Sequence, residues 1–326
     1  MRVLITGAAG FIGYHLAKRL LADGHSVSGL DNLSPYYGVE IKKARLQNLE
    51  RQFGITASIC DIIDRNSLDR LVADAEAEII VHLAAQPGVR YSLTNPEAYV
   101  ASNLVGFANL LECCRRHPPR HLLYASSSSV YGNGEALPLR ESDRTDMPLS
   151  MYAATKQANE AMAYSYSHLF GIPATGLRLF TVYGEWGRPD MALFSFAEAI
   201  LSEQPIAIYN DGQMARDFTY VGDAVEAVTR LFDRNPSASA RSAPHRVVNI
   251  ASGHQVALPD FIAALEQALD KKAEKRYCEL QAGDVTETWA DTSLLADLTG
   301  FTARTTISEG IAHFASWFKS WRGPTC

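Results

Sequence analysis

A tyrosine and a lysine four residues apart are the first pair in this chain with the means for acid–base chemistry. Tyr152 and Lys156 enclose the segment YAATK. Side chains at positions i and i+4 of a helix lie on one face, so the phenol and the ammonium group would be neighbours. A nearby positive charge favours a phenolate, so we predict that Lys156 lowers the pKa of Tyr152 and makes it usable as a base. The same spacing also occurs on ordinary solvated helix faces.

Four consecutive serines, 126–129, follow a predicted strand at 121–125. Open α/β sheets bind ligands at the carboxyl ends of their strands, where these hydroxyls could hydrogen-bond a reacting oxygen. A simple serine-rich turn is the alternative. It does not explain why the run comes after that strand.

A glycine-rich turn lies directly after the first predicted strand and opens the first predicted helix. It reads GAAGFIG, with glycines at Gly7, Gly10 and Gly13, a spacing of G-x-x-G-x-x-G rather than G-x-G-x-x-G. Such glycines allow a tight turn and let backbone N–H groups approach a pyrophosphate at the helix N-terminus. An ordinary strand-to-helix turn is the alternative, but strand, helix and position all favour a dinucleotide.

The identity of the dinucleotide is predicted from Asp31, at the end of the second strand. A carboxylate there accepts hydrogen bonds from the ribose hydroxyls and repels a 2′-phosphate, which favours NAD over NADP. A cationic nicotinamide would also help to lower the pKa of Tyr152. The further predicted cofactor contacts are Phe11, Ile12, Asn32, Asp61, Ile62, Leu83, Ala84, Ala85, Asn103 and Ser126, together with Tyr152 and Lys156.

These residues are positioned by alternating strands and helices. The predicted strands are 3–6, 26–30, 55–60, 79–83, 121–125, 173–179 and 247–250, and the predicted helices are 11–22, 67–74, 96–116, 150–170, 259–272 and 308–317. Nearly continuous apolar strands in such an alternation indicate a parallel sheet covered on both faces. We therefore predict a Rossmann-type, doubly wound α/β fold. Residues 1–178, joined by about 214–250, would bind the dinucleotide, and 179–326 would mainly form a smaller substrate-binding lobe, with interleaved segments.

Composition excludes several classes of protein. The 326 residues are 47% hydrophobic and 20% charged, with a net charge of −6, which argues against a basic nucleic-acid surface. No apolar run approaches the length of a membrane span, and glycines interrupt the N-terminus where a signal peptide would be apolar. The five cysteines (Cys60, Cys113, Cys114, Cys278 and Cys326) lack metal-ligand spacing. We predict buried thiols, no metal, no membrane partner and a cytoplasmic location.

Taken together, the motifs resemble the extended short-chain dehydrogenase/reductase family, over essentially the whole chain. Within it the match narrows to the nucleotide-sugar epimerases, most closely to the UDP-glucuronate 4-epimerases. The motifs that carry this are QPGVRYS at 86–92, NLVG at 103–106, YASSSSVYG at 124–132, MYAATK at 151–156, LRLFTVYG at 177–184, WGRPDMA at 186–192 and RDFTY at 216–220.

The resemblance implies NAD-dependent, reversible C4 epimerisation of UDP-glucuronate to UDP-galacturonate through a 4-keto intermediate. Tyr152 would take the proton of the C4 hydroxyl while NAD takes the hydride, Ser127 would assist, and Lys156 would also hold the nicotinamide ribose. The substrate would be bound by Arg90, Ser127, Ser128, Ser129, Tyr152, Thr181, Arg188, Ala192 and Arg216. Of these, Ser128, Ser129, Thr181 and Arg188 would hold the carboxylate, which a guanidinium and hydroxyls suit. Arg90 and Arg216 are candidates for either the diphosphate or the carboxylate. A structural ion pair is the alternative for Arg188, and Arg178 is expected to anchor a sheet-to-loop junction.

Rival reactions lack part of their pattern. Related dehydratases and UDP-glucuronate decarboxylases typically carry an acid just before Val-Tyr-Gly, where this chain has Ser128 and Ser129, and UDP-glucose 4-epimerases usually have Asn at Thr181. Two departures from the closest family are Leu179, often an aromatic residue, and QAGD at 281–284 in place of Pro-Gly-Asp. A non-catalytic NAD(H)-binding sensor is a different class, but such proteins commonly lose the Tyr/Lys pair. The resemblance also implies a homodimer in which the helices 96–116 and 150–170 form a four-helix bundle.

Overall fold

The computed structural model describes residues 1–134, 136–239, 242–281 and 283–323. Within these ranges the main sheet has seven strands in the order β10-β6-β5-β4-β1-β2-β3, and all its pairs are parallel. They are β1 (Arg2–Thr6), β2 (Ser26–Asp31), β3 (Ser58–Ile59), β4 (Ile79–His82), β5 (His121–Ser127), β6 (Ala174–Leu179) and β10 (His245–Ile250). The strand order reverses direction between β1 and β4. The predicted Rossmann-type fold is confirmed.

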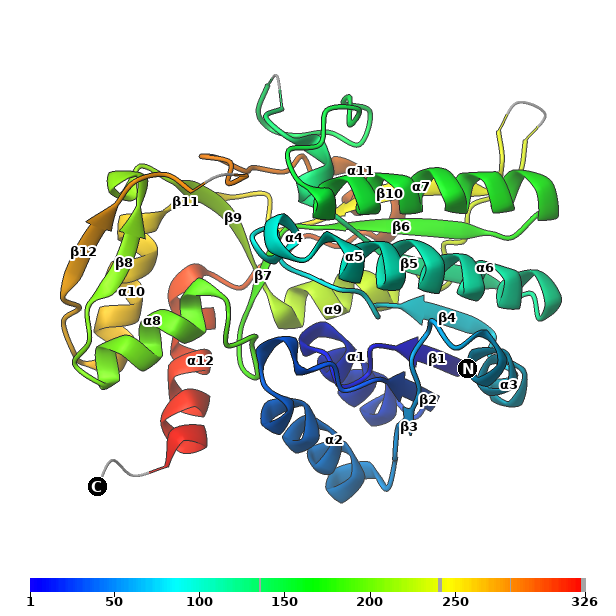
Figure 1. Ribbon diagram of the computed structural model, residues 1–326, viewed down its shortest axis with the longest axis horizontal. Coiled ribbons are helices and arrows are strands. Elements are labelled where there is room, and N and C mark those ends of the chain that lie inside the picture. The colour runs from blue at the N-terminus through cyan, green and yellow to red at the C-terminus, as the bar shows by residue number, and fades with distance from the viewer. Residues whose placement is uncertain (135, 240–241, 282, 324–326) are drawn as a thin grey trace.

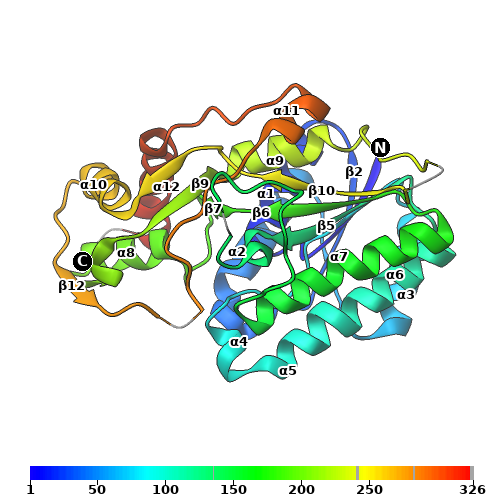
Figure 2. The ribbon, with the colours of Figure 1, turned by 90° about the horizontal axis from the view of Figure 1, so that it is seen from above.

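Helices cover both faces of this sheet (Figures 1 and 2). The helices on one face are α1 (Phe11–Ala22), α2 (Val39–Phe53), α9 (Val221–Arg230) and α11 (Ser293–Thr299), and those on the other are α3 (Arg65–Ala75), α6 (Phe107–Arg116) and α7 (Met151–Phe170). α6 is preceded by α4 (Tyr91–Thr94), α5 (Pro96–Tyr99) and the π-helical segment η2 (Val100–Gly106). α7 starts where Ser150 accepts a hydrogen bond from the Ala153 amide, an N-cap.

A second lobe lies beside the carboxyl ends of the main strands (Figure 1). Its strands are β7 (Thr181–Tyr183), β8 (Ile206–Tyr209), β9 (Ala215–Tyr220), β11 (Gln255–Ala257) and β12 (Lys275–Cys278), arranged in the described part of the chain as β11-β9-β7 and β12-β8. Its helices are α8 (Ala192–Leu201), α10 (Leu258–Leu269) and α12 (Ile307–Arg322). Their apolar faces share a core centred on Phe261, Phe314 and Phe318.

Three further segments are single 3-10 turns. They are η1 (Pro35–Tyr37), η3 (Ser128–Tyr131) and η4 (Asn210–Gly212). η1 follows β2 and η3 follows β5, so both lie at the carboxyl edge of the sheet, beside the turns predicted to bind ligand.

Several boundaries differ from the prediction. β5 extends to Ser127, so Ser126 and Ser127 end the strand rather than follow it. β3 is reduced to two exposed residues because it is the edge strand and pairs only with β2 among the described strands. α10 ends at Leu269 rather than residue 272, and α12 continues to Arg322 rather than 317. The predicted helix 96–116 consists of α5, η2 and α6 in succession, and the sequence prediction missed α2, α8, α9 and α11.

The structure can be compared with the predictions made from composition about the cysteines, metal sites and membrane-spanning helices. Cys60, Cys113 and Cys114 are buried as predicted, Cys278 is half-buried, and Cys326 lies outside the described residues. Among the described residues no group of three or more His, Cys, Asp or Glu side chains is placed to hold a metal ion. Nor does any helix in the described ranges have the length and apolar character to cross a membrane.

Candidate active site

The glycine-rich turn between β1 and α1 forms the floor of the site. Gly7 has a φ of +76°, and a Cβ there would lie 2.7 Å from the amide nitrogen of Ala84, just after the end of the neighbouring strand β4. A Cβ on Gly13 would lie 2.1 Å from the carbonyl oxygen of Gly7. Gly10 is the N-cap of α1 and brings no capping side chain, and the first turn of the helix has no acidic residue. The first-turn amides and the positive helix end therefore suit the pyrophosphate of a dinucleotide.

Asp31 stands at the end of β2, next to this turn. Its carboxylate accepts hydrogen bonds from the amides of Ala9 (3.1 Å) and Leu33 (2.8 Å), so the backbone fixes its orientation. Asn32 beside it donates to Asp61 at 2.9 Å. Asp31 and Asn32 both line the cavity above the glycine turn. An oriented carboxylate here fits the ribose of NAD and disfavours a 2′-phosphate.

Tyr152 and Lys156 reach the same cavity from the first turns of α7. The Lys156 ammonium donates to the carbonyl oxygen of Ala125 at 2.8 Å and lies 6.0 Å from the centre of the Tyr152 ring. Ser127, from the end of β5, hydrogen-bonds with Tyr152. Tyr152, Lys156 and Ser127 all line the cavity, and Lys156 is buried with 3% of its surface exposed. The geometry places a candidate base, a buried cation and a hydroxyl together at the carboxyl edge of the sheet.

The electrostatics of this group differ from the prediction. Burial raises the pKa of Tyr152 above its ordinary value, and the hydrogen bond with Ser127 and the charge of Arg188 oppose that rise. Burial also lowers the pKa of Lys156 to about 8. The predicted lowering of the Tyr152 pKa by Lys156 is therefore wrong for the protein by itself, because desolvation of the phenolate outweighs the neighbouring groups.

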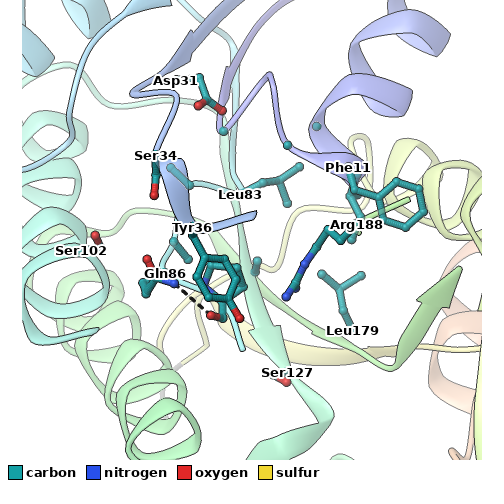
Figure 3. A pocket seen from close by; sticks show the side chains of 18 of the residues that line it. Phe11, Asp31, Ser34, Tyr36, Leu83, Gln86, Ser102, Ser127, Leu179 and Arg188 are labelled. Carbon is teal, nitrogen blue, oxygen red and sulfur yellow. Dashed lines mark hydrogen bonds between the residues drawn. The ribbon is translucent and has the colours of Figure 1, made fainter. Parts of the chain in front are cut away.

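Arg188 enters the cavity from the opposite wall, in the loop between β7 and α8. Figure 3 shows its side chain extending between Tyr36 and Leu179. Its guanidinium forms an ion pair with Asp190, with Nε–Oδ1 and Nη2–Oδ2 distances of 3.0 and 2.5 Å. The ion pair is the one expected under the structural alternative, and Arg188 also lines the cavity, so its contact with a substrate carboxylate stays a prediction.

The structure brings most of the predicted residues together. The predicted residues that line the cavity are Gly7, Gly10, Phe11, Ile12, Gly13, Asp31, Asn32, Ile62, Leu83, Ala84, Ala85, Ser126, Ser127, Tyr152, Lys156 and Arg188. Thr181 and Ala192 line a smaller adjoining pocket that shares Phe11 and Arg188 with it.

Other predicted residues lie outside both cavities. Asn103 is buried behind the wall, where it accepts from the Gln86 amide at 2.8 Å and donates to Thr155 at 3.0 Å. Asp61 accepts the hydrogen bond from Asn32, and Ser128 and Ser129 begin η3. In this structure these residues touch the pocket only through their neighbours.

Arg90 and Arg216 lie apart from the cavity, near the segment 283–286. Arg90 pairs with Asp284 at 2.9 Å, and Arg216 donates to the carbonyl oxygen of Thr286 at 2.7 Å and to that of Val285. Ala282 of the predicted departure at 281–284 lies outside the described residues. Arg178 pairs with Glu160 at 2.8 Å and donates to the carbonyl of Glu141, which confirms its anchoring role.

Sequence reasoning missed several residues that line the cavity, chiefly Tyr36 and Gln86. Tyr36 comes from η1, and its ring packs on Tyr91 with centroids 4.9 Å apart. The available signal was the consecutive Tyr36-Tyr37 pair, which comes shortly after Asp31 on a loop that leaves the carboxyl end of a strand.

A parallel sheet with a glycine turn at its switch point, an acid ending β2 and a Tyr-Lys pair in one cavity define a nicotinamide-dependent enzyme that acts on a hydroxyl-bearing substrate. Residues 3–251 match the model of the NAD dependent epimerase/dehydratase family. The chain belongs to this family, as its motifs indicated.

Named relatives cover nearly the whole chain. A probable UDP-glucuronate 4-epimerase of Rhizobium meliloti is 48% identical over 330 residues, 98% of this chain and 97% of that protein. The structure of a UDP-glucuronic acid 4-epimerase from Bacillus cereus, in complex with UDP-glucuronic acid and NAD, is similar with a TM-score of 0.90 and 32% identity, covering 98% of this chain and 100% of that one. A UDP-glucose 4-epimerase from Thermus thermophilus with NAD has a TM-score of 0.87 at 29% identity, covering all of both chains.

Proposed function

We propose that the protein catalyses the reversible C4 epimerisation of UDP-glucuronate to UDP-galacturonate, with NAD as its cofactor. The observation that carries this proposal is the placement of the Arg188 guanidinium in the same cavity as Tyr152, Lys156 and Ser127. An acid–base group acts on a hydroxyl, and the guanidinium suits a carboxylate on the same small substrate. The named relatives support the choice of sugar, because those described above include two UDP-glucuronate 4-epimerases.

The residues of the chain have distinct parts in this reaction. NAD, when bound, supplies the redox chemistry by accepting the C4 hydrogen as hydride and returning it. Tyr152 takes the proton of the C4 hydroxyl and gives it back to the C4 oxygen of the product. Ser127 hydrogen-bonds both Tyr152 and this oxygen, so it holds the two in line. Lys156 is anchored by its hydrogen bond to the carbonyl oxygen of Ala125, 6.0 Å from the centre of the Tyr152 ring, and would bind the nicotinamide ribose.

The carboxylate creates a special demand. Oxidation at C4 makes a β-keto acid, which loses CO₂ when the bond to the carboxylate aligns with the ketone π system. We expect Arg188 and Thr181, which line the adjoining pocket together, to hold the carboxylate out of that alignment. In the structure Asp190 occupies the guanidinium, so a substrate carboxylate would share or replace an existing partner.

The same site fits less well with the other candidate reactions. UDP-glucuronate decarboxylation needs the same oxidation but no tight hold on the carboxylate, and Ser128 and Ser129 stand where such enzymes typically carry an acid. Thr181 argues in the same way against a plain UDP-glucose 4-epimerase. A non-catalytic NAD(H) sensor would have no use for the buried Lys156 beside Tyr152.

Product identification tests the proposal. Purified protein with NAD is incubated with UDP-glucuronate and, separately, UDP-glucose, and the products are followed by NMR. The expected result is a mixture of UDP-glucuronate and UDP-galacturonate, with no net change in reduced cofactor. CO₂ and a UDP-pentose as main products would replace the proposal by decarboxylation, and turnover of UDP-glucose alone would replace it by a neutral-sugar epimerase.

We also propose the homodimer that the family resemblance implies. Exposed apolar side chains on η2 and α7 support it: Val105 is 46% exposed, Leu169 65% and Phe170 46%. Large apolar side chains at such exposure on neighbouring helices suit a subunit interface. Sedimentation equilibrium of the NAD-bound protein should give twice the chain mass, and a single-chain mass at micromolar concentration would contradict it.

The division of labour and the cellular setting are further proposals. We propose that the main sheet and its helices, with 221–250 joined to them, bind the dinucleotide and that the second lobe covers the sugar. The predicted joining segment of about 214–250 starts too early, because β9 (Ala215–Tyr220) pairs with β7 and β11 in the second lobe. The parallel pairing of β10 with β6 and the contact of α9 with α1 in one core support this division.

We also propose a cytoplasmic location. Cys113 and Cys114 are free thiols, which suits the cytoplasm, where thiols stay reduced.

A further inference from the structure

Arg45 of α2 is a fully buried guanidinium to which the proposed reaction assigns no part. Its side chain has 0% exposure. Nη1 donates to the carbonyl oxygen of Ala9 at 2.8 Å, and Nη2 donates to those of Trp186 at 2.6 Å and Gly187 at 3.1 Å. The hydroxyl of Tyr37 lies 3.3 Å from Nη1, and Nε has no hydrogen-bond partner among the described residues.

Burial of the charged Arg45 guanidinium has a high free-energy cost, which a side chain that only filled space would avoid. The hydrogen bonds that Arg45 makes within the described part of the chain go to three carbonyl oxygens and the Tyr37 hydroxyl rather than to a carboxylate, and burial lowers its pKa. Neutral carbonyl groups therefore balance the cost of burying the charge. An apolar side chain of similar size would avoid the cost of burying a charge, but it could not donate hydrogen bonds to these carbonyl oxygens. We therefore attribute the arginine at this position to its several N–H donors.

The carbonyls that Arg45 joins belong to two different parts of the site. Ala9 is in the glycine turn, and its own amide donates to Asp31, the proposed ribose ligand. Trp186 and Gly187 immediately precede Arg188, the proposed carboxylate ligand. One guanidinium thus links the glycine turn to the loop that carries Arg188. Its partners in these two segments, Ala9 and Trp186, are 36 and 141 residues away from Arg45 in the sequence.

The substrate loop is strained where Arg45 holds it. Trp186 has a φ of +55°, a backbone conformation that bulky side chains rarely adopt. The loop is also fixed by His15, whose Nε2 lies 2.8 Å from the carbonyl oxygen of Glu185, and by the Trp317 ring, 5.2 Å from that of Trp186. Arg45 contacts the carbonyls of the strained residue and the one after it, so it bears directly on the backbone that aims Arg188.

We propose that Arg45 is a positioning residue that sets the place of Arg188 relative to the glycine turn and Tyr152, and thereby keeps the reaction on epimerisation rather than loss of CO₂. The inference rests on the proposed function. If the loop 184–188 loosens, Arg188 no longer holds the carboxylate at a fixed angle to the ketone. A displacement of about 1 Å in a positioning element is enough to cost on the order of 100-fold in rate.

The side reaction that Arg45 suppresses has a defined product. In the 4-keto intermediate the bond between C5 and the carboxylate carbon breaks, and its electron pair moves into the ketone to form an enolate. The carboxylate leaves as CO₂, and the enolate takes a proton from water at C5. The product is a UDP-4-keto-pentose, and the hydride taken from C4 would stay on the bound cofactor unless it is returned to C4 to give a UDP-pentose. In both cases one CO₂ is released for each substrate molecule whose carboxylate was not held in place.

The experiment compares Arg45→Met and Arg45→Lys with Arg51→Met. Arg51 is exposed on the same helix, so it receives the same substitution without touching the site. Each NAD-loaded holoenzyme is given UDP-glucuronate labelled at the carboxyl carbon, below its thermal transition. Epimer and labelled CO₂ are measured together, with retained NAD and the melting temperature as separate readouts.

We expect both Arg45 variants to lose epimerase kcat by about 10- to 100-fold and to raise the fraction of turnovers that release CO₂, with Arg45→Lys less affected because it keeps the charge. Arg51→Met should match the wild type. Lower melting temperature with an unchanged CO₂ fraction in a folded Arg45 variant would show a merely structural role and overturn the inference. If Arg45→Met does not fold, Arg45→Lys decides by the same criterion. A wild-type protein that does not epimerise UDP-glucuronate would instead remove the proposed function itself.

Discussion

At the scale of single side chains, opposing influences act on the pKa of Tyr152. Burial stabilises its neutral phenol, whereas Ser127 and the Arg188 charge favour the phenolate. Lys156, with its pKa lowered to about 8, loses its own charge in the slightly alkaline range. The readiness of the base therefore depends on Arg188, a residue expected from the sequence to act on the substrate alone.

Replacement of Tyr152 by Phe tests its role as the base. The phenyl ring keeps the edge-on packing on Tyr99, with centroids 6.1 Å apart, and removes the proton acceptor. We expect kcat to fall by at least about 100-fold, the usual range for loss of a general base, with NAD still bound. Turnover is measured by NMR and NAD by its release on denaturation. Full activity of Tyr152→Phe would contradict the assignment, and loss of NAD would mean that the ring itself holds the cofactor.

Replacement of Arg188 by Met tests the electrostatic link. The Arg188 charge lowers the pKa of Tyr152, so its removal raises that pKa and moves the rising limb of the kcat–pH profile to higher pH. The profile is measured between pH 6 and 9.5, with Arg51→Met as the control that removes a distant charge. An unshifted limb in Arg188→Met would show that this charge does not govern the base.

How far single residues could be predicted depends on whether local sequence determines their surroundings. The Tyr152–Lys156 pair and Asp31 were found because helix spacing and strand ends fix their positions. The direction of the Tyr152 pKa was missed because it depends on burial by residues distant in the chain. Arg45 was missed for the same reason. An arginine on a charged helix gives no sign that one of its hydrogen-bond partners, the carbonyl of Trp186, lies 141 residues away in the sequence.

On the scale of elements, the turn from β1 to α1 depends on close backbone contact. A Cβ on Gly13 would lie 2.1 Å from the Gly7 carbonyl oxygen, a distance that forces the turn to open. We expect Gly13→Ala to lose bound NAD and to be destabilised by about 1–3 kcal/mol, as for other overpacked sites. NAD content and urea unfolding measure the two effects.

The matched control for this variant is Gly171→Ala. Gly171 ends α7 at a φ of +67°, with nothing within 4 Å of a Cβ. Alanine there costs about 1–2 kcal/mol of backbone strain far from the turn. Stability should fall in both variants, but NAD should be lost only in Gly13→Ala. A Gly13→Ala protein that keeps its NAD would contradict the fit of the turn to a dinucleotide.

The elements that the sequence predicted well are those with one clear apolar pattern. α1 was predicted with its exact bounds because a glycine turn precedes it and its apolar side chains repeat at helical spacing. α2 was missed because most of its residues are charged or polar, and its few buried ones include Lys42 and Arg45. The strands of the second lobe were missed because they are short and take their partners from distant segments, such as β8 with β12.

On the scale of the whole molecule, four histidines with lowered pKa values lie in the interior: His82 and His121 are buried, and His15 and His245 are half-buried. Burial lowers their pKa values to about 4 for His15, about 3 for His82, about 4 for His121 and about 4 for His245. They lie in α1, β4, β5 and β10, so the main sheet and one of its covering helices both contain histidines whose protonation would destabilise the fold. When the chain unfolds, each regains an ordinary pKa and binds a proton below about pH 6.5.

Acid should therefore unfold the protein more readily than its carboxylates alone would predict. The folded pKa of each histidine is lower than the unfolded one, so the unfolded state binds more protons and stability falls as the pH decreases from about 6.5 toward 4. One such histidine lowers the free energy of unfolding by about 2 kcal/mol when the pH is reduced from 8 to 5. Urea unfolding at those two pH values, at a fixed excess of NAD, measures the loss.

His121→Gln isolates one contribution. His121 has 0% exposure, and its Nε2 lies 2.8 Å from Thr175 Oγ1, a contact that the glutamine amide can replace. We expect this variant to lose about 2 kcal/mol less than the wild type between pH 8 and pH 5, whereas His254→Gln, at an exposed position, loses as much as the wild type. Burial raises the pKa of Glu141 and Asp217, which act in the opposite direction but cancel in this comparison. Equal pH sensitivity in His121→Gln and wild type would show that the buried histidine is not a source of acid instability.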